Sequence, residues 1–224
     1  MLIFEFMNAY DILLKPYENY TQFQIILEIL GATFGILSVY FSTKRNILVF
    51  PTGLVSTIIY VYILYHSGLL GDCIINIYYS IMSIYGWFLW NKSKEDKVHV
   101  SVAWTSKKEW KTATLLFLIS CLFVITIYYF KPYLDSPTSN DMPSLGLYHL
   151  DWANWTDIFT TSIFLVGMWL MAKQRIENWF FWILGDFICI PMMISKGLGI
   201  TSVQYLVFTI MAIIGYVSWK KSFE

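Results

Sequence analysis

The residues most informative about function lie on one face of a predicted membrane helix, residues 178–195. Asn178, Trp182 and Asp186 follow one another at intervals of four residues, and Trp179 lies three residues before Trp182. A helix therefore brings an amide, two indoles and a carboxylate to one side. Asp186 comes about eight residues into the apolar run, about 12 Å along the axis and near the middle of a bilayer. A carboxylate at that depth is costly and marks a candidate binding site, although a helix–helix hydrogen bond also accounts for it.

Trp182 is the candidate for stacking on a substrate. A deep indole beside a carboxylate suits a flat cationic ring, because the indole face attracts a cation and the carboxylate balances its charge. Asn178 and Trp179 lie in the first turn of the run, where Trp is common at the membrane surface for reasons unrelated to binding. We expect these two residues to form a gate or an interfacial belt, and Trp182 and Asp186 to carry recognition.

Polar side chains on other apolar runs are further candidates for binding hydroxyl and amide groups. In run 72–91, Asn76, Tyr79 and Ser83 follow one face of the helix. Such a stripe lines water, substrate or another polar helix. Glu28 lies about two turns below the outer surface, and a helix–helix hydrogen bond explains it as well as a binding role does. The further candidate substrate-binding residues are Glu28, Phe50, Asn76, Tyr79, Ser80, Gln204, Tyr205 and Thr209.

The sequence lacks the patterns of several other functions. Its three histidines lie in or beside loops, and it has no metal-binding histidine motif, nucleophile elbow or phosphate-cradling glycine loop. The three cysteines lie in or beside apolar runs, which favours small buried side chains over ligands or disulfides. We therefore expect no metal, no cofactor and no enzyme activity. Nucleic acid is not an expected partner either, because no basic patch lies on a soluble domain.

The composition is that of an integral membrane protein. Hydrophobic residues make up 57% of the 224 residues and charged residues 13%, against about 25% charged residues in soluble domains. Of the 15 Lys and Arg residues, all but Lys15, Lys131 and Lys196 fall on one side of a topology with seven spans. This bias predicts a cytoplasmic C-terminus and a periplasmic N-terminus. The predicted spans are residues 23–42, 47–65, 72–91, 112–130, 155–172, 178–195 and 200–219.

The first three predicted spans resemble the last three. Because three is an odd number and one span lies between the halves, both halves enter the membrane in the same direction, which predicts parallel repeats. The aligned pairs are Asn46 with Asn178, Phe50 with Trp182 and, after a shift of three residues, Gly86 with Gly215 and Trp90 with Trp219.

The expected architecture is an all-α polytopic membrane protein with seven transmembrane helices in a 3+1+3 arrangement of parallel pseudo-repeats. The span over residues 112–130 has no counterpart and little polarity, so we expect a linker helix that faces lipid. The predicted segments are an amphipathic N-terminal segment (1–22), a first three-helix repeat (23–91), a basic cytoplasmic loop with the linker helix (92–131), an external loop (132–154) and a second three-helix repeat (155–224).

This order of spans resembles the PnuC family of bacterial nicotinamide riboside (vitamin B3) transporters. The residues that carry the resemblance are Lys44-Arg45-Asn46 at the start of the second span, and Trp179, Trp182 and Asp186 in the sixth. The resemblance covers the chain from about residue 20, and its most specific part is the Trp-x-x-Trp-x-x-x-Asp pattern. It implies a fold similar to that of the SWEET sugar transporters, a homotrimer in the bacterial inner membrane, and facilitated diffusion of nicotinamide riboside. A cytoplasmic kinase that phosphorylates the riboside would trap it.

Two alternatives to nicotinamide riboside transport stay open. A thiamine transporter of the same family fits equally well, because thiamine is also a cationic aromatic. A membrane receptor or sensor would need an output surface, whereas the longest loop on the predicted cytoplasmic side, about residues 92–111, is a short basic linker. A membrane enzyme is the least supported class because catalytic groups are absent.

Overall fold

The computed structural model describes residues 21–66, 70–93, 99–135, 145–148, 150–195 and 199–224, which are mostly helical and include two isolated β-bridges, Asn46–His99 and Ala103–Arg175. Six of its helices are long and apolar enough to cross a membrane, and the described apolar part of α3, Val49–Ile63, is shorter. The prediction of an all-α polytopic membrane protein is confirmed, and the described residues form seven helices, six of which are candidate spans. The expected amphipathic segment lies almost entirely outside the described residues. The helices are α2 (Gln22–Thr43), α3 (Val49–His66), α4 (Leu70–Lys92), α5 (Lys107–Asp135), α6 (Trp152–Ala172), α7 (Asn178–Ser195) and α8 (Gly199–Phe223).

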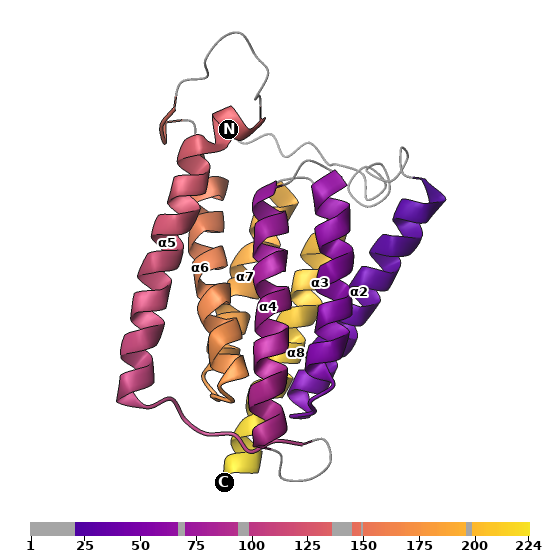
Figure 1. Ribbon diagram of the computed structural model, residues 1–224, viewed down its shortest axis with the longest axis vertical. Coiled ribbons are helices and arrows are strands. Elements are labelled where there is room, and N and C mark those ends of the chain that lie inside the picture. Colours follow the sequence, from indigo (N-terminus) through magenta and orange to yellow (C-terminus); the bar gives the residue numbers. More distant parts are fainter. Residues whose placement is uncertain (1–20, 67–69, 94–98, 136–144, 149, 196–198) are drawn as a thin grey trace, which may run out of the picture.

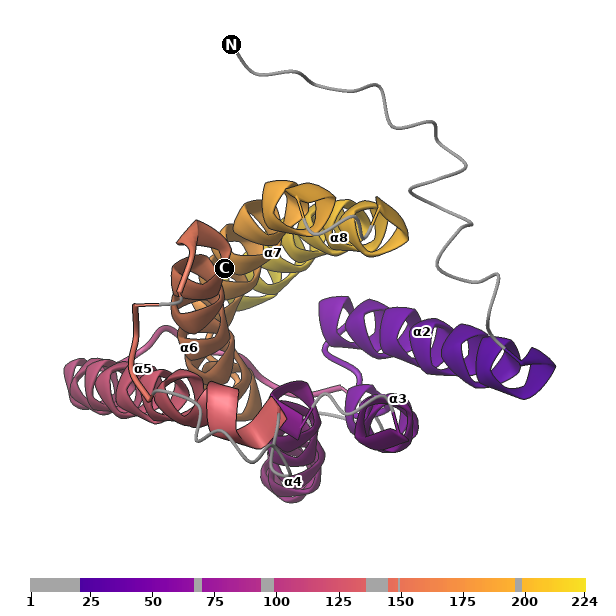
Figure 2. The same cartoon turned by 90° about the horizontal axis from the view of Figure 1, so that it is seen from above.

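The helices run along one common direction and gather in two groups (Figures 1 and 2). In the first group α2 packs on α3 and α3 on α4, and in the second group α6 packs on α7 and α7 on α8. The groups meet where α4 contacts α6 and where α8 contacts α2. Each of these two contacts joins the last helix of one group to the first helix of the other.

Helix α5 lies outside the two groups and packs on α6. Its outward side exposes large apolar side chains such as Leu115, Leu118 and Leu122, as expected of a helix that faces lipid. The helix continues through Pro132 to Asp135, beyond the expected start of the external loop. Pro132 has no N–H to donate to the preceding turn, and the helix ends three residues after it.

The same turn follows the first helix of each group. Arg45 (φ 57°) and Gln174 (φ 62°) have left-handed backbones. The next N–H closes each helix end, from Asn46 to Phe41 O at 2.9 Å and from Arg175 to Leu170 O at 2.9 Å. This is the hydrogen-bond pattern of a Schellman end, which glycine usually provides. The sequence carries no glycine at either position, so the turn was not visible in it.

These turns correct the repeat alignment, because Arg45 corresponds to Gln174 and Asn46 to Arg175 rather than to Asn178. The interval from Arg45 to Gln174 then holds through all three helices of each group, so no three-residue shift is needed. In this register Phe50 is the counterpart of Trp179, not of Trp182. The contacts agree: a Cβ at Gly86 would lie 2.2 Å from the Phe50 ring, and one at Gly215 would lie 2.4 Å from the Trp179 ring. Further counterparts in this register are Gly35 and Phe164, Gly53 and Trp182, Ser56 and Gly185, Thr57 and Asp186, and Ser80 and Thr209.

Four buried rings join the two groups at the lower end of Figure 1, and we call Phe50, Trp90, Trp179 and Trp219 the aromatic cluster. Trp90 Nε1 donates to the carbonyl of Met171 at 3.1 Å, and Trp219 Nε1 donates to the carbonyl of Ser42 at 2.7 Å. Each indole thus reaches from one group to the end of the first helix of the other. Burial of these rings and both hydrogen bonds hold the lower end closed.

Residues 99–106, here called the crossing segment, run beneath the aromatic cluster from one group to the other (Figure 1). Val100 is fully buried, and its N–H donates to Arg45 O at 3.2 Å in the first group. Ala103 N–H donates to Gln174 O at 3.1 Å in the second group. The backbone N–H and hydroxyl of Thr105 donate to the Glu177 carboxylate, the hydroxyl at 2.6 Å. The crossing segment therefore ties the two helix-end turns together.

Candidate functional site

The predicted face of α7 divides into two environments. Asn178 and Trp179 are buried at the lower end, where Trp179 meets Trp219 edge to face at 5.4 Å between ring centroids. The interfacial-belt interpretation of Trp179 is therefore wrong, since its ring packs between helices and only 2% of its surface is exposed. Among the described residues, Asn178 Oδ1 and Trp179 Nε1 have no hydrogen-bond partner. Trp182 and Asp186 lie further along the helix, and Trp182 still packs against the core that contains the aromatic cluster.

Trp182 belongs to a stack of three rings from three helices. Phe164 of α6 stacks on Trp182 at 5.4 Å and 25°, and on Tyr205 of α8 at 6.5 Å and 7°. Gly185 makes room for this arrangement, because a Cβ there would lie 2.2 Å from Phe164 Cε1. Sequence reasoning missed Phe164, since a Phe inside an apolar helix carries no signal until its contact with Gly185 is known. The stack offers parallel aromatic faces to a planar ring.

Asp186 is a buried carboxylate beside this stack, with 4% of its surface exposed. It interacts electrostatically with Tyr205 of α8, and also with Tyr79 of α4 in the first group. Among the ion pairs of the described residues, none joins a Lys or Arg to Asp186. A buried carboxylate with hydroxyl neighbours and without a cation suits a cationic ligand.

The polar candidates on α4 lie opposite the stack. Tyr79 packs against the same small cluster as Trp182 and Tyr205. The Ser80 hydroxyl lies 2.7 Å from the Thr57 hydroxyl of α3, and Ser80 also donates to Asn76 O at 2.9 Å. Tyr79 therefore lies with the candidates of the second group, whereas Ser80 pairs with Thr57 inside the first group.

The remaining predicted site residues lie elsewhere or already have partners. Phe50 is part of the aromatic cluster, 4.9 Å from Trp90 between ring centroids, so the expectation that it stands in for Trp182 is wrong. Thr209 donates to Tyr205 O of its own helix at 2.9 Å. Glu28 and Gln204 both interact with Tyr60, which joins α2, α3 and α8.

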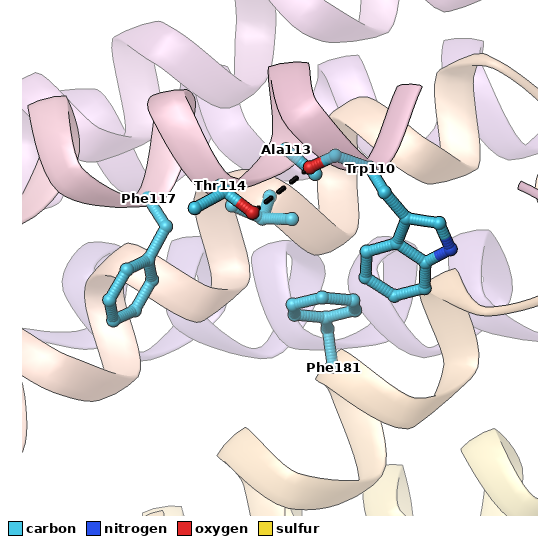
Figure 3. Close-up of a pocket in the computed structure, with 6 residues that line it drawn as sticks. Trp110, Ala113, Thr114, Phe117 and Phe181 are labelled. Carbon is cyan, nitrogen blue, oxygen red and sulfur yellow. Dashed lines mark hydrogen bonds between the residues drawn. The ribbon is translucent and has the colours of Figure 1, made fainter. Parts of the chain in front are cut away.

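An outer pocket of about 150 Å³ lies between α5, α6 and α7 (Figure 3). Its one hydroxyl, on Thr114, already donates to Trp110 O at 3.0 Å. None of the predicted site residues reaches it, and its apolar walls have no group to recognise a polar substrate. The lining residues are Trp110, Ala113, Thr114, Phe117, Val166 and Phe181.

Comparison with known proteins identifies the family. Residues 25–221 match the model of the nicotinamide mononucleotide transporter family. The nicotinamide riboside transporter PnuC of Escherichia coli K12 is 21% identical over 204 residues, which cover 88% of this chain and 85% of that protein. The riboflavin/roseoflavin transporter RibM of Streptomyces davaonensis is 22% identical over 210 residues, which cover 92% and 89%.

The fold is shared with a solved structure. The crystal structure of the vitamin B3 transporter PnuC matches with a TM-score of 0.64 at 18% identity, over 93% of this chain and 95% of that chain. The family match covers most of the sequence and agrees with the helices described above. The chain therefore belongs to the nicotinamide mononucleotide transporter family, which confirms the resemblance to PnuC transporters.

Proposed function

We propose that this protein transports nicotinamide riboside across the bacterial inner membrane into the cytoplasm. The observation that carries the proposal is the buried Asp186 carboxylate beside the stack of Trp182, Phe164 and Tyr205. The pyridinium of the riboside is flat and positively charged. It would stack on the ring faces while Asp186 balances its charge.

The relatives do not separate the substrates by sequence identity, since the riboside and riboflavin transporters are 21% and 22% identical to this chain. The substrate must therefore be argued from the site. Riboflavin carries a neutral ring system and so has no charge for a buried carboxylate to balance. Thiamine is a cationic aromatic and remains the second candidate, because Asp186 favours it on the same grounds.

We propose that the two helix groups are parallel repeats, residues 23–91 and 155–224, in a 3+1+3 arrangement like that of SWEET transporters. The repeated helix-end turns and the two reciprocal contacts between the groups support this arrangement. Rocking of one group against the other would then expose a central site to each side in turn. Opening the lower end requires the Trp90 and Trp219 hydrogen bonds to break, and Asn178 Oδ1 and Trp179 Nε1 would gain partners there.

The distribution of positive charge supports a cytoplasmic lower end. The two helix-end turns lie there with Lys44, Arg45, Lys173 and Arg175, and α8 ends there with Lys220 and Lys221 (Figure 1). By the positive-inside rule the C-terminus is cytoplasmic and the N-terminus periplasmic. We further propose passive uniport, trapping of the riboside by a cytoplasmic kinase, and assembly into a homotrimer, as the resemblance to PnuC transporters implies.

Binding of the three vitamins to purified protein tests the substrate. We expect nicotinamide riboside to bind most tightly, and Asp186→Asn to weaken it by roughly tenfold to a hundredfold, because an interaction with a charged group is worth about 1.5–3 kcal/mol. Asp151→Asn is the matched control, since that exposed carboxylate caps α6 by accepting the Asn154 N–H at 2.8 Å, and Asn caps a helix as well as Asp does. Tighter binding of thiamine or riboflavin would reassign the substrate, and unchanged affinity in Asp186→Asn would remove Asp186 from the site.

Uptake into proteoliposomes tests the mechanism. We expect uptake of the riboside down its gradient, indifferent to an imposed proton gradient. Accumulation driven uphill by a proton gradient would contradict uniport. Binding without uptake would favour the receptor alternative over transport.

A further inference from the structure

The corrected repeat alignment identifies Thr57 as the counterpart of Asp186. Thr57 lies on α3 and its partner Ser80 on α4, as Asp186 lies on α7 and the counterpart of Ser80, Thr209, on α8. The hydroxyls of Thr57 and Ser80 are 2.7 Å apart and partly buried. Where the second group carries a carboxylate, the first group therefore carries a pair of hydroxyls.

Both positions face the boundary between the two groups. Tyr60, one turn after Thr57 on α3, interacts with Gln204 of α8 in the second group. Asp186 interacts with Tyr79 of α4 in the first group. Because residues three apart lie near each other on a helix, Thr57 lies close to the side of α3 from which Tyr60 reaches the second group.

The surroundings of the two positions differ in size and polarity. Trp182 stands one turn before Asp186, whereas its counterpart Gly53 stands one turn before Thr57. A Cβ at Gly53 would meet the Ser38 hydroxyl at 2.9 Å and the Ser83 hydroxyl at 3.7 Å. The second group thus offers aromatic faces and a charge, and the first group offers small side chains and hydroxyls.

We infer that the paired hydroxyls of Thr57 and Ser80 form the subsite for the sugar hydroxyls of the substrate, whose cationic ring lies on the second group. This inference rests on the proposed function and adds the orientation of the substrate. The Ser80 hydroxyl lies within donor distance of Asn76 O, and the Thr57 hydroxyl lies 3.2 Å from Leu54 O and 2.7 Å from the Ser80 hydroxyl. Each hydroxyl has one proton and two lone pairs, so the pair keeps lone pairs that accept hydrogen bonds from a sugar diol. Only one orientation of a ligand with a cationic ring and a hydroxyl-rich group matches both surroundings.

A double-mutant cycle tests the subsite, with one change made in the ligand and the other in the protein. The probes are nicotinamide riboside and its 2′,3′-dideoxy analogue, which keeps the charged ring, and the variant is Thr57→Val, which keeps the shape and removes the hydroxyl. We expect the wild-type protein to prefer the riboside by about tenfold, because a site built to bind hydroxyls rejects ligands that lack them. In Thr57→Val we expect that preference to fall to about one.

Matched variants make the result decisive. Thr52→Val removes a hydroxyl of the same helix that donates to Leu48 O at 2.7 Å, and should keep the wild-type preference. Ser80→Ala carries the same test should Thr57→Val fail to fold. If a folded variant still prefers the riboside over its dideoxy analogue as the wild-type protein does, the subsite is overturned. That result includes a variant that binds both ligands more weakly by the same factor. Failure of the wild-type protein to bind either ligand would instead overturn the proposed function.

Discussion

Replacing Gly185 by alanine tests whether the aromatic stack is built as described. A Cβ at this position would lie 2.2 Å from Cε1, 2.7 Å from Cζ and 2.9 Å from Cδ1 of Phe164. Carbon atoms in contact are normally about 3.5–4.0 Å apart, so the ring must move by more than about 1 Å. That movement takes Phe164 out of its stacked position on Trp182.

The magnitude follows from the cost of overpacking. Inserting a methyl group into a packed core costs about 1–3 kcal/mol. For a chain of this length each kcal/mol lowers the melting temperature by about 2–4 °C, so we expect Gly185→Ala to melt roughly 2–12 °C below the wild-type protein. We also expect weaker binding of nicotinamide riboside, because Trp182 loses its aligned neighbour.

Thermal melting and ligand titration of the purified protein measure both effects. Gly35→Ala is the control in the first group, since its Cβ would meet only the Ser56 hydroxyl at 3.2 Å. Adding Phe164→Leu to Gly185→Ala should restore much of the stability but not the binding, because it relieves the clash without rebuilding the stack. A Gly185→Ala protein that melts and binds like the wild type would refute the contact between Gly185 and Phe164.

Two further predictions concern the lower end of the bundle. Trp90→Phe and Trp219→Phe each remove an indole hydrogen bond to a buried carbonyl, of Met171 or Ser42, which keeps a backbone N–H donor from its own helix-end turn. Each substitution should lower stability by about 0.5–1.5 kcal/mol in thermal melting, and the two losses should be alike. A loss in only one variant would contradict the equivalence of the two indoles. Glu177→Gln weakens the carboxylate that holds Thr105, so amide hydrogen exchange in residues 99–106 should quicken. Glu224→Gln, in an exposed ion pair with Lys220 at 3.9 Å, should leave that exchange unchanged; equal exchange in both variants would show that Glu177 does not anchor the crossing segment.

The helices and the membrane class were predictable because they depend on local sequence. An apolar run long enough to span a bilayer has to satisfy its backbone hydrogen bonds internally, and a helix does so without help from distant residues. The Asp186 candidate was visible for the same reason, since the cost of a charge in an apolar run depends on depth alone. The spacing of Trp179, Trp182 and Asp186 also led to the family that the comparisons confirm.

Matching identical residues between the two halves could not give the correct register of the repeat. The identical residues Asn46 and Asn178 suggested one alignment, but the turns at Arg45 and Gln174 require another. A left-handed residue that is not glycine leaves no signal in the sequence. The error placed Phe50 opposite Trp182 and concealed the correspondence between Thr57 and Asp186.

The sequence by itself determined that the chain spans a membrane with helices, which carboxylate lies deep in it, and to which family it belongs. Only the tertiary structure decided that Phe164 stacks on Trp182, that Phe50 and Trp90 help close the lower end, and that the crossing segment ties both groups together. The physical reason is that helix formation is local, whereas a packing partner is set by which faces of which helices meet.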